Sequence, residues 1–178
     1  FITTKPIVDN SEPFSALAFR FLIVAIGFLI FSYFSKKEII VSKKNIAESI
    51  LTGVLFHGLY LGGVFYSISK GMPTGIAALI VTLQPILTNI LAGPLLNEQI
   101  GWKQWLGIAL GFIGAVLVLG FDIGETIPIS GVVATFIALF AITGSTIWQK
   151  KLSHNISLPV NNMYQAIGGF LFHALIII

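Results

Sequence analysis

The chain has 178 residues, of which 56% are hydrophobic and only 10% are charged, and its mean hydropathy is +0.94. A soluble domain carries about 25% charged residues, so this composition excludes a water-soluble globular fold. The net charge of +3 lies mostly in short segments between apolar runs, which favours a membrane protein over a nucleic-acid-binding one. The absence of cysteine excludes disulfides, thiol catalysis and cysteine-based metal sites.

Six apolar segments follow one another along the chain. A helix needs about 20 mostly apolar residues to cross a ~30 Å hydrocarbon core, and in lipid its backbone must satisfy its own hydrogen bonds. The sequence therefore predicts an all-α polytopic membrane protein, a helical bundle. The predicted spans lie near 14–34, 47–69, 74–96, 102–120, 130–149 and 159–178. Asn45-x-x-Glu48 has the pattern of a capping box that opens the second span.

Two cations accompany the first predicted span. Residues 1–8 have the composition of the end of an earlier helix, with Lys5 one turn before Asp9. Arg20 lies about 10 Å below the outer start of the first span at about 1.5 Å per residue. It could pair with Asp9 or Glu12, extend its head group to water, or bind a substrate carboxylate, with pairing preferred and substrate contact second. Lys5 has the same alternatives.

His57 lies in the middle of the second span, with Tyr60 on its face. An ionisable side chain at this depth is a functional-site hypothesis by default, either as a cavity-lining group or as a proton-linked one. It could also be a neutral histidine that is hydrogen bonded across helices. The neutral histidine is preferred over proton coupling, because no intramembrane carboxylate accompanies it. His173, in the last span, is a weaker candidate of the same kind.

The third span carries Gln84 and Pro85 in its middle. Proline donates no backbone hydrogen bond and crowds the carbonyl four residues back, so we predict a kink there. Gln84 and Thr88, one turn on, share a face. The kinked helix could line a substrate cavity with the Gln84 amide facing a solute. Alternatively, the kink serves packing and Gln84 bonds a neighbouring helix.

Two helices carry faces of small residues that allow another helix to approach closely. These faces are predicted to serve packing and to carry no chemistry of their own. The glycines concerned are Gly58 and Gly62 in the second span and Gly107, Gly111 and Gly114 in the fourth.

Lysine placement predicts the orientation in the membrane. Loops 35–46, 97–103 and 150–158 hold seven of the lysines, and the loops on the other side are mostly acidic. By the positive-inside rule, these three loops are cytoplasmic and the protein is a multi-pass protein of the inner, or plasma, membrane. Three tryptophans fall at the predicted inner ends, as interface anchors do: Trp102, Trp105 and Trp148.

The stretch "YSISKGMPTGIAALIVTLQPILTNILAGPLLNEQIGWKQWLGIALGFIGAVLVL", residues 66–119, resembles the EamA-type transporters of the drug/metabolite transporter superfamily. The shared pattern is a small-residue helix start at 75–78, a mid-helix proline at Pro85, an acidic residue at Glu98, and a glycine-rich next helix. The segment 5–21 is similar to the family's first loop and second helix, with Arg20 at the family's frequent arginine position.

The resemblance implies a ten-helix fold built from two inverted five-helix repeats. On that map the chain is a fragment from the end of helix 1 to helix 7. Residues 1–120 belong to the first repeat and 130–178 to the start of the second. The implied function is a membrane transporter of small metabolites, amino acids or drugs, with export as the expected direction, by alternating access driven by a gradient. The implied partners are the lipid bilayer and a small-molecule substrate, with no cofactor, metal or nucleic acid; the oligomeric state stays open.

Three alternative functions have less support in the sequence. A membrane-embedded enzyme lacks support, because no Gly-x-Ser-x-Gly elbow surrounds Ser145 and no HExxH motif or P-loop occurs. A non-transporting scaffold has no need of a kink and embedded polar residues. A nucleotide-sugar or triose-phosphate carrier is expected to have more cationic groups in its spans than Arg20 and Lys5.

Overall fold

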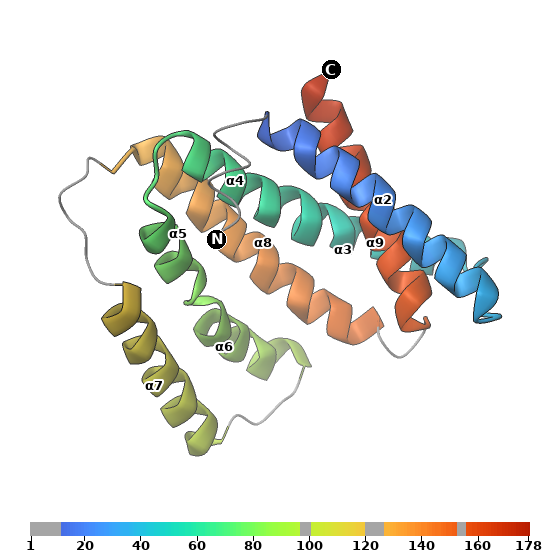
Figure 1. Ribbon diagram of the computed structural model, residues 1–178. Helices are drawn as coiled ribbons and strands as arrows, with labels where there is room; N and C mark the ends of the chain where they lie inside the picture. Colours follow the sequence, from blue (N-terminus) through green and yellow to red (C-terminus); the bar gives the residue numbers. More distant parts are fainter. Residues whose placement is uncertain (1–11, 97–100, 120–126, 153–155) are drawn as a thin grey trace.

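The computed structural model describes residues 12–96, 101–119, 127–152 and 156–178, and every regular element in these ranges is a helix (Figure 1). This confirms the predicted all-α fold. The helices are α2 Pro13–Phe34, α3 Lys43–Gly53, η1 Val54–Leu61, α4 Gly62–Ser69, α5 Thr74–Val81, α6 Gln84–Leu96, α7 Trp102–Leu119, α8 Ile129–Leu152 and α9 Leu158–Ile177.

Four helical stretches of the described chain are long and apolar enough to cross a membrane: Pro13–Phe34, Lys43–Ser69, Thr74–Leu95 and Ile129–Lys150. They correspond to four of the six predicted spans. The apolar part of α7, Trp102–Leu117, is shorter. Helix α9 has the length, but polar side chains such as Asn161, Gln165 and His173 lower its hydropathy.

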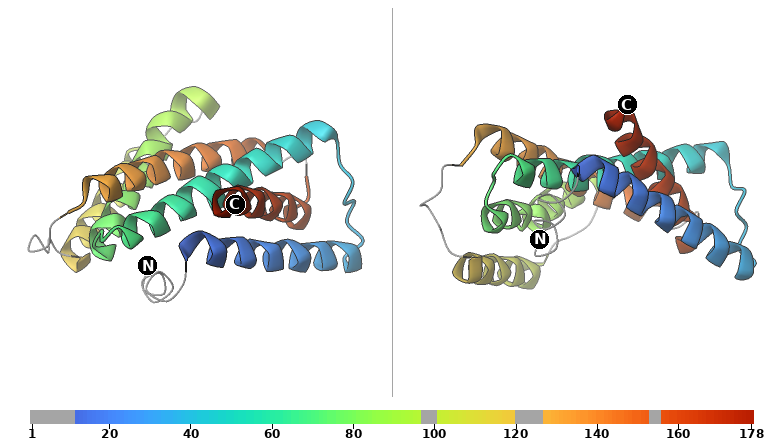
Figure 2. Two further views of the ribbon diagram at one scale, coloured as in Figure 1. Left: turned by 90° about the horizontal axis from the view of Figure 1, so that it is seen from above. Right: turned by 45° about the horizontal axis from the view of Figure 1, so that its top comes forward.

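Helix α9 lies between α2 and the long helix formed by α3, η1 and α4 (Figure 2). Helix α8 runs beside that long helix and also contacts α5 and α6, while α7 lies at the edge of the bundle against α5. The largest buried cluster joins α2 and α4 to α9 through Leu17, Phe21, Ala25, Phe65 and Ala166. Outward-facing apolar side chains such as Phe19 and Leu117 suit a lipid environment.

Two helix starts have local causes. At α2, the Glu12 carboxylate accepts hydrogen bonds from the Ser15 backbone N–H (2.8 Å) and Ser15 Oγ (2.7 Å), and Pro13 opens the first turn. The predicted start of the second span at Asn45 is wrong. Helix α3 begins at Lys43, because Ser42 Oγ accepts from the Asn45 N–H at 3.3 Å.

The third span is interrupted, as the proline predicts. Helix α5 ends at Val81 and α6 begins at Gln84. Pro85 has no N–H to donate to the Val81 carbonyl, and its ring disfavours helical geometry in the residue before it. Thr82 Oγ1 donates to the Leu79 carbonyl at 2.6 Å, which satisfies one of the acceptors at the end of α5.

The second span contains a feature that the sequence did not predict. Residues Val54–Leu61 form a π-helix, η1, between α3 and α4. Such wide turns are rare and often occur at functional sites. His57, Gly58 and Tyr60 all belong to this segment.

Candidate functional site

A groove with a volume of about 820 Å³ lies between the interrupted helix α5–α6 and α7. This is within the size range of small-molecule sites, about 300–1,000 Å³. Its lining residues are Ala78, Val81, Thr82, Gln84, Pro85, Asn89, Gln104, Gly107, Ile108, Gly111 and Phe112.

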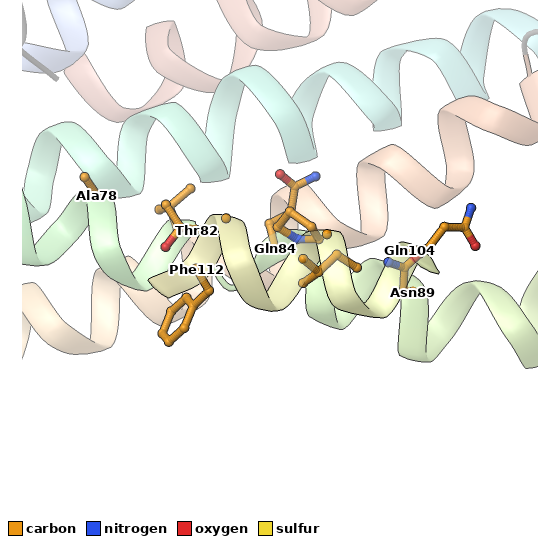
Figure 3. Close-up of a pocket in the computed structure, with 11 residues that line it drawn as sticks. Ala78, Thr82, Gln84, Asn89, Gln104 and Phe112 are labelled. Atoms are coloured by element: carbon orange, nitrogen blue, oxygen red, sulfur yellow. The ribbon is translucent and has the colours of Figure 1, made fainter. Parts of the chain in front are cut away.

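The groove offers hydrogen-bonding groups but no charge among its lining residues. Figure 3 shows Asn89 of α6 and Gln104 of α7 near one end, Thr82 and Phe112 towards the other, and Gln84 between them. Amides and a hydroxyl in an otherwise apolar, aromatic surface can orient a small polar solute without an ion pair.

Gln84 takes both of the roles that the sequence left open. It lines the groove, and its Nε2 donates to Thr146 Oγ1 of α8 at 3.1 Å. Thr146 Oγ1 in turn donates to the Ile142 carbonyl at 2.7 Å. The amide is therefore held through its nitrogen, so its carbonyl oxygen is the atom that can accept from a solute.

Thr88 is not among the lining residues, and its buried Oγ1 has no hydrogen-bond partner among the described atoms. Asn89, which sequence reasoning did not select, takes that place. Because the helix restarts at Gln84, Pro85 and Asn89 are one turn apart and face the same way. The sequence signal that could have identified Asn89 is an amide side chain within an otherwise apolar run.

The predicted small-residue faces have different surroundings. A Cβ at Gly58 would lie 2.6 Å from the Phe172 ring, and one at Gly62 would lie 2.9 Å from His173 Cε1, so α9 packs against both. By contrast, no described atom lies within 4 Å of a Cβ at Gly107, Gly111 or Gly114. No described helix makes the predicted close approach there, and Gly107 and Gly111 line the groove instead.

A second cluster joins His57 to α9 and α2. His173 Nε2 lies 2.9 Å from the His57 backbone carbonyl, and the Phe21 ring centroid lies 4.4 Å from that of His57 and 5.9 Å from that of His173. The Arg20 guanidinium carbon is 5.7 Å from the centre of the Phe21 ring. The hydrogen bond between α9 and η1 thus involves the backbone carbonyl of His57 and not the His57 ring.

The remaining predicted site residues are dispersed. Tyr60 packs on a cluster of Val64, Ile68 and Ala138, away from the groove lining. Arg20 is exposed, and no described carboxylate lies within ion-pairing distance of it. Lys5 lies outside the described residues. The structure therefore brings Gln84 and Pro85 together at the groove and His57 and Arg20 together at the histidine cluster.

Comparison with known proteins gives consistent matches. The model of the EamA-like transporter family matches residues 1–120. A probable amino-acid metabolite efflux pump of Salmonella typhimurium is 27% identical over 165 residues, which cover 89% of this chain and 51% of that protein. An uncharacterized transporter of Bacillus subtilis, YyaM, is 33% identical over 155 residues, covering 83% of this chain and 48% of that protein.

An S-adenosylmethionine uptake transporter of Rickettsia felis is 31% identical over 119 residues, covering 66% of this chain and 39% of that protein. The chain spans about half the length of the first two of these relatives. No solved structure gives a significant match.

Proposed function

The chain belongs to the EamA-like transporter family, and from this premise we propose that it is part of a transporter that moves small metabolites along the groove between α5–α6 and α7. The observation that carries the proposal is the groove itself. It lies beside an interrupted helix long and apolar enough to cross a membrane, and uncharged hydrogen-bonding side chains line it. Interrupted helices form the substrate sites of many transporters.

The substrate class that fits is a neutral or zwitterionic compound related to amino acids. The groove's amides and hydroxyl suit such a solute, and Phe112 offers an apolar contact for a side chain. A nucleotide-sugar or triose-phosphate substrate fits poorly, because the described lining has no cation to neutralise a phosphate. The name of the Salmonella relative, an efflux pump for amino-acid metabolites, supports export as the direction.

The interruption at Thr82 and Leu83 gives the groove a place to bend. Helices α5 and α6 meet without a continuous hydrogen-bond ladder, so each can tilt with little cost to the other. We propose that this joint opens and closes the groove during alternating access driven by a gradient. The residues that line the groove all belong to 1–120, which we assign to the first of two inverted repeats, with 130–178 assigned to the second.

The test uses the full-length protein in liposomes. Exchange of radiolabelled amino acids and of S-adenosylmethionine is measured across the membrane, per folded molecule. Asn89→Leu and Gln104→Leu should each lower the exchange rate, because they remove groove amides without adding charge. Thr143→Val is the control, since Thr143 is buried in α8 and bonds only its own helix among described partners. Wild-type exchange in a folded Asn89→Leu, Gln104→Leu double variant would rule out the groove as the path.

A further inference from the structure

A line of polar residues winds along α9 across the bundle. Ser157, which caps the helix, Asn161, Gln165, Gly169 and His173 follow at four-residue intervals, so each lies beside the next while the line turns around the helix by about 40° at each step. The line extends about 24 Å at about 1.5 Å per residue. Asn161, Gln165 and His173 are exposed by only 1%, 2% and 0%.

His57 closes the one gap in this line. A Cβ at Gly169 would collide with the His57 side chain, so the glycine leaves the space that this imidazole occupies. From the start of α9 upward, the polar groups are therefore Ser157, Asn161, Gln165, His57 and His173. The π-helix η1 places His57 here.

Two helices cover the line. Helix α3 approaches α9 so closely that a Cβ at Gly53 would collide with the Gln165 backbone carbonyl, and one at Gly168 with the Ile50 carbonyl. Helix α2 covers another side, with Phe21 packed against both histidines. In the described chain these polar groups are thus shielded from lipid.

The line holds most of the unsatisfied buried polar atoms of the described chain. Partners are lacking for Ser157 Oγ, Asn161 Nδ2, Asn161 Oδ1, Gln165 Nε2, His57 Nδ1 and His173 Nδ1. A buried polar atom without a hydrogen bond costs about 1–3 kcal/mol, so such atoms are rare and are commonly satisfied by ordered water.

His173 has one ring nitrogen without a hydrogen-bond partner among the described atoms. The His57 carbonyl can only accept a hydrogen bond, so Nε2 of His173 carries the hydrogen and Nδ1 is a free base. The charged and titratable groups around the pair, in the described ranges, are Glu12 and Arg20 of α2 and the histidines themselves. The Arg20 guanidinium lies beside the Phe21 ring that packs on His57.

Glu12 lies at the start of α2, close enough to His173 for an electrostatic interaction. The pKa of Glu12 is lowered, mainly by the hydrogen bond from the Ser15 hydroxyl and least by the interaction with His173. The Phe14 ring of the same first turn of α2 lies 5.9 Å from the His173 ring. His173 is thus close to the membrane surface that the topology predicts to be external.

We propose that this line is a proton path across the bundle, with His173 as its proton-binding group and ordered water bridging the unpartnered atoms. A hydronium ion at the Glu12 end gives its proton to Nδ1 of neutral His173 and leaves as water. The imidazolium keeps its Nε2–H bond to the His57 carbonyl. Nδ1 then returns the proton to a water of the line, which leads through His57, Gln165 and Asn161 towards Ser157. The role of this path in coupling transport to a proton gradient rests on the proposed function.

The experiment is nuclear magnetic resonance on the full-length protein in lipid nanodiscs, with histidine labelled in ¹³C and ¹⁵N. His57→Gln and His173→Gln variants assign the signals. Between pH 8 and pH 5, His173 should convert from the Nε2–H tautomer to the imidazolium, while His57 stays neutral. Both rings should show magnetisation transfer from water. The proposal would be overturned if His173 stays neutral at pH 5, or if neither histidine ring shows magnetisation transfer from water.

A variant pair then tests the line itself. Asn161→Leu combined with Gln165→Leu should remove the water contact of His57. Stability should be unchanged or higher, because Asn161 Nδ2, Asn161 Oδ1 and Gln165 Nε2 have no described partners. Met163→Leu, also buried on α9, is the matched control and should change neither the water contact of His57 nor the stability of the protein. Water contact at His57 that persists in the double variant would contradict the path.

This measurement needs no substrate, so it remains decisive if the exchange assay shows no transport. If exchange does occur, an inward proton gradient should accelerate it at least several-fold in wild type and not in His173→Gln. A gradient response that His173→Gln retains would overturn the assignment of the coupled proton to His173 while leaving the groove proposal intact.

Discussion

Two glycine faces with the same spacing lie in opposite surroundings. Gly58 and Gly62, four residues apart, meet side chains of α9. Gly107 and Gly111, also four apart, face the open groove between α6 and α7. Small residues at this spacing leave space beside a helix. Whether another helix or a solute fills the space depends on the helices around it.

The largest effect is expected at the tight contact. In Gly168→Leu, the new side chain would meet the backbone of Ile50, with the carbonyl carbon 3.1 Å from its Cβ. Backbone cannot rotate away, so α9 must separate from α3, and we expect little folded protein. Gly144→Leu on α8 has open space at its Cβ and is the control. Size-exclusion chromatography after heating compares the two, and equal melting temperatures would contradict the close contact.

The next largest effect concerns the groove. Gly111→Leu should leave folding intact, because no described atom lies within 4 Å of its Cβ, and should fill the groove. We expect substrate exchange to fall at least about tenfold in liposomes, which corresponds to about 1.4 kcal/mol. Gly114→Leu, on the same helix but outside the groove lining, should exchange normally. A poorly folded Gly111→Leu protein would instead restore the packing role predicted from the sequence.

Much of the fold was predictable because lipid permits few structures. Charge-free apolar stretches fixed helix positions to within a few residues, and Pro85 located the interruption. The π-helix was not predictable, since no residue type selects it. The start of α3 was misplaced because Ser42 competes with Asn45 for the same cap, and both have the required chemistry.

The site was less predictable, because polar residues in a span reveal burial but not their neighbours. Gln84 was predicted either to line a cavity or to bond a neighbouring helix, and it both lines the groove and bonds Thr146. His57 was predicted either to line a cavity or to be a neutral histidine hydrogen bonded across helices, and it lies against His173, more than 100 positions later in the chain. Only the crossing of α9 with η1 makes these two residues neighbours.

A smaller loss is expected when the groove amide is removed. Gln84→Leu should weaken substrate binding by about 1–3 kcal/mol if the amide oxygen accepts from the solute, because the solute's donor then stays unpaired. Thr146→Val separates the two roles, since it removes the bond to α8 and keeps the amide. Binding to purified protein is measured by scintillation proximity. If Thr146→Val weakens binding as much as Gln84→Leu does, the amide acts through packing.

A still smaller effect is expected at the joint between α5 and α6. Pro85→Ala restores an N–H that can bond the Val81 carbonyl, so α5 and α6 can join into one helix. The protein should insert normally and exchange substrate a few-fold more slowly, because the joint bends less. Binding affinity should change little. The comparison of exchange rate with equilibrium binding checks this, and a loss of affinity without a loss of rate would remove the joint from the mechanism.

The smallest effect is expected at the start of α2. Glu12 accepts two hydrogen bonds from Ser15 next to the positive end of the helix dipole, and its pKa in the folded protein lies below the ordinary value. It therefore adds stability above its unfolded pKa, and this stability is lost as the pH falls through its folded pKa. Glu12→Gln keeps an acceptor for Ser15 but removes the charge, which is worth about 0.3–1 kcal/mol at a helix end. Melting temperatures of the two proteins should differ slightly at pH 7 and converge as the pH falls below the folded pKa of Glu12. A difference that stays the same at every pH would show that the charge of this carboxylate does not stabilise the helix start.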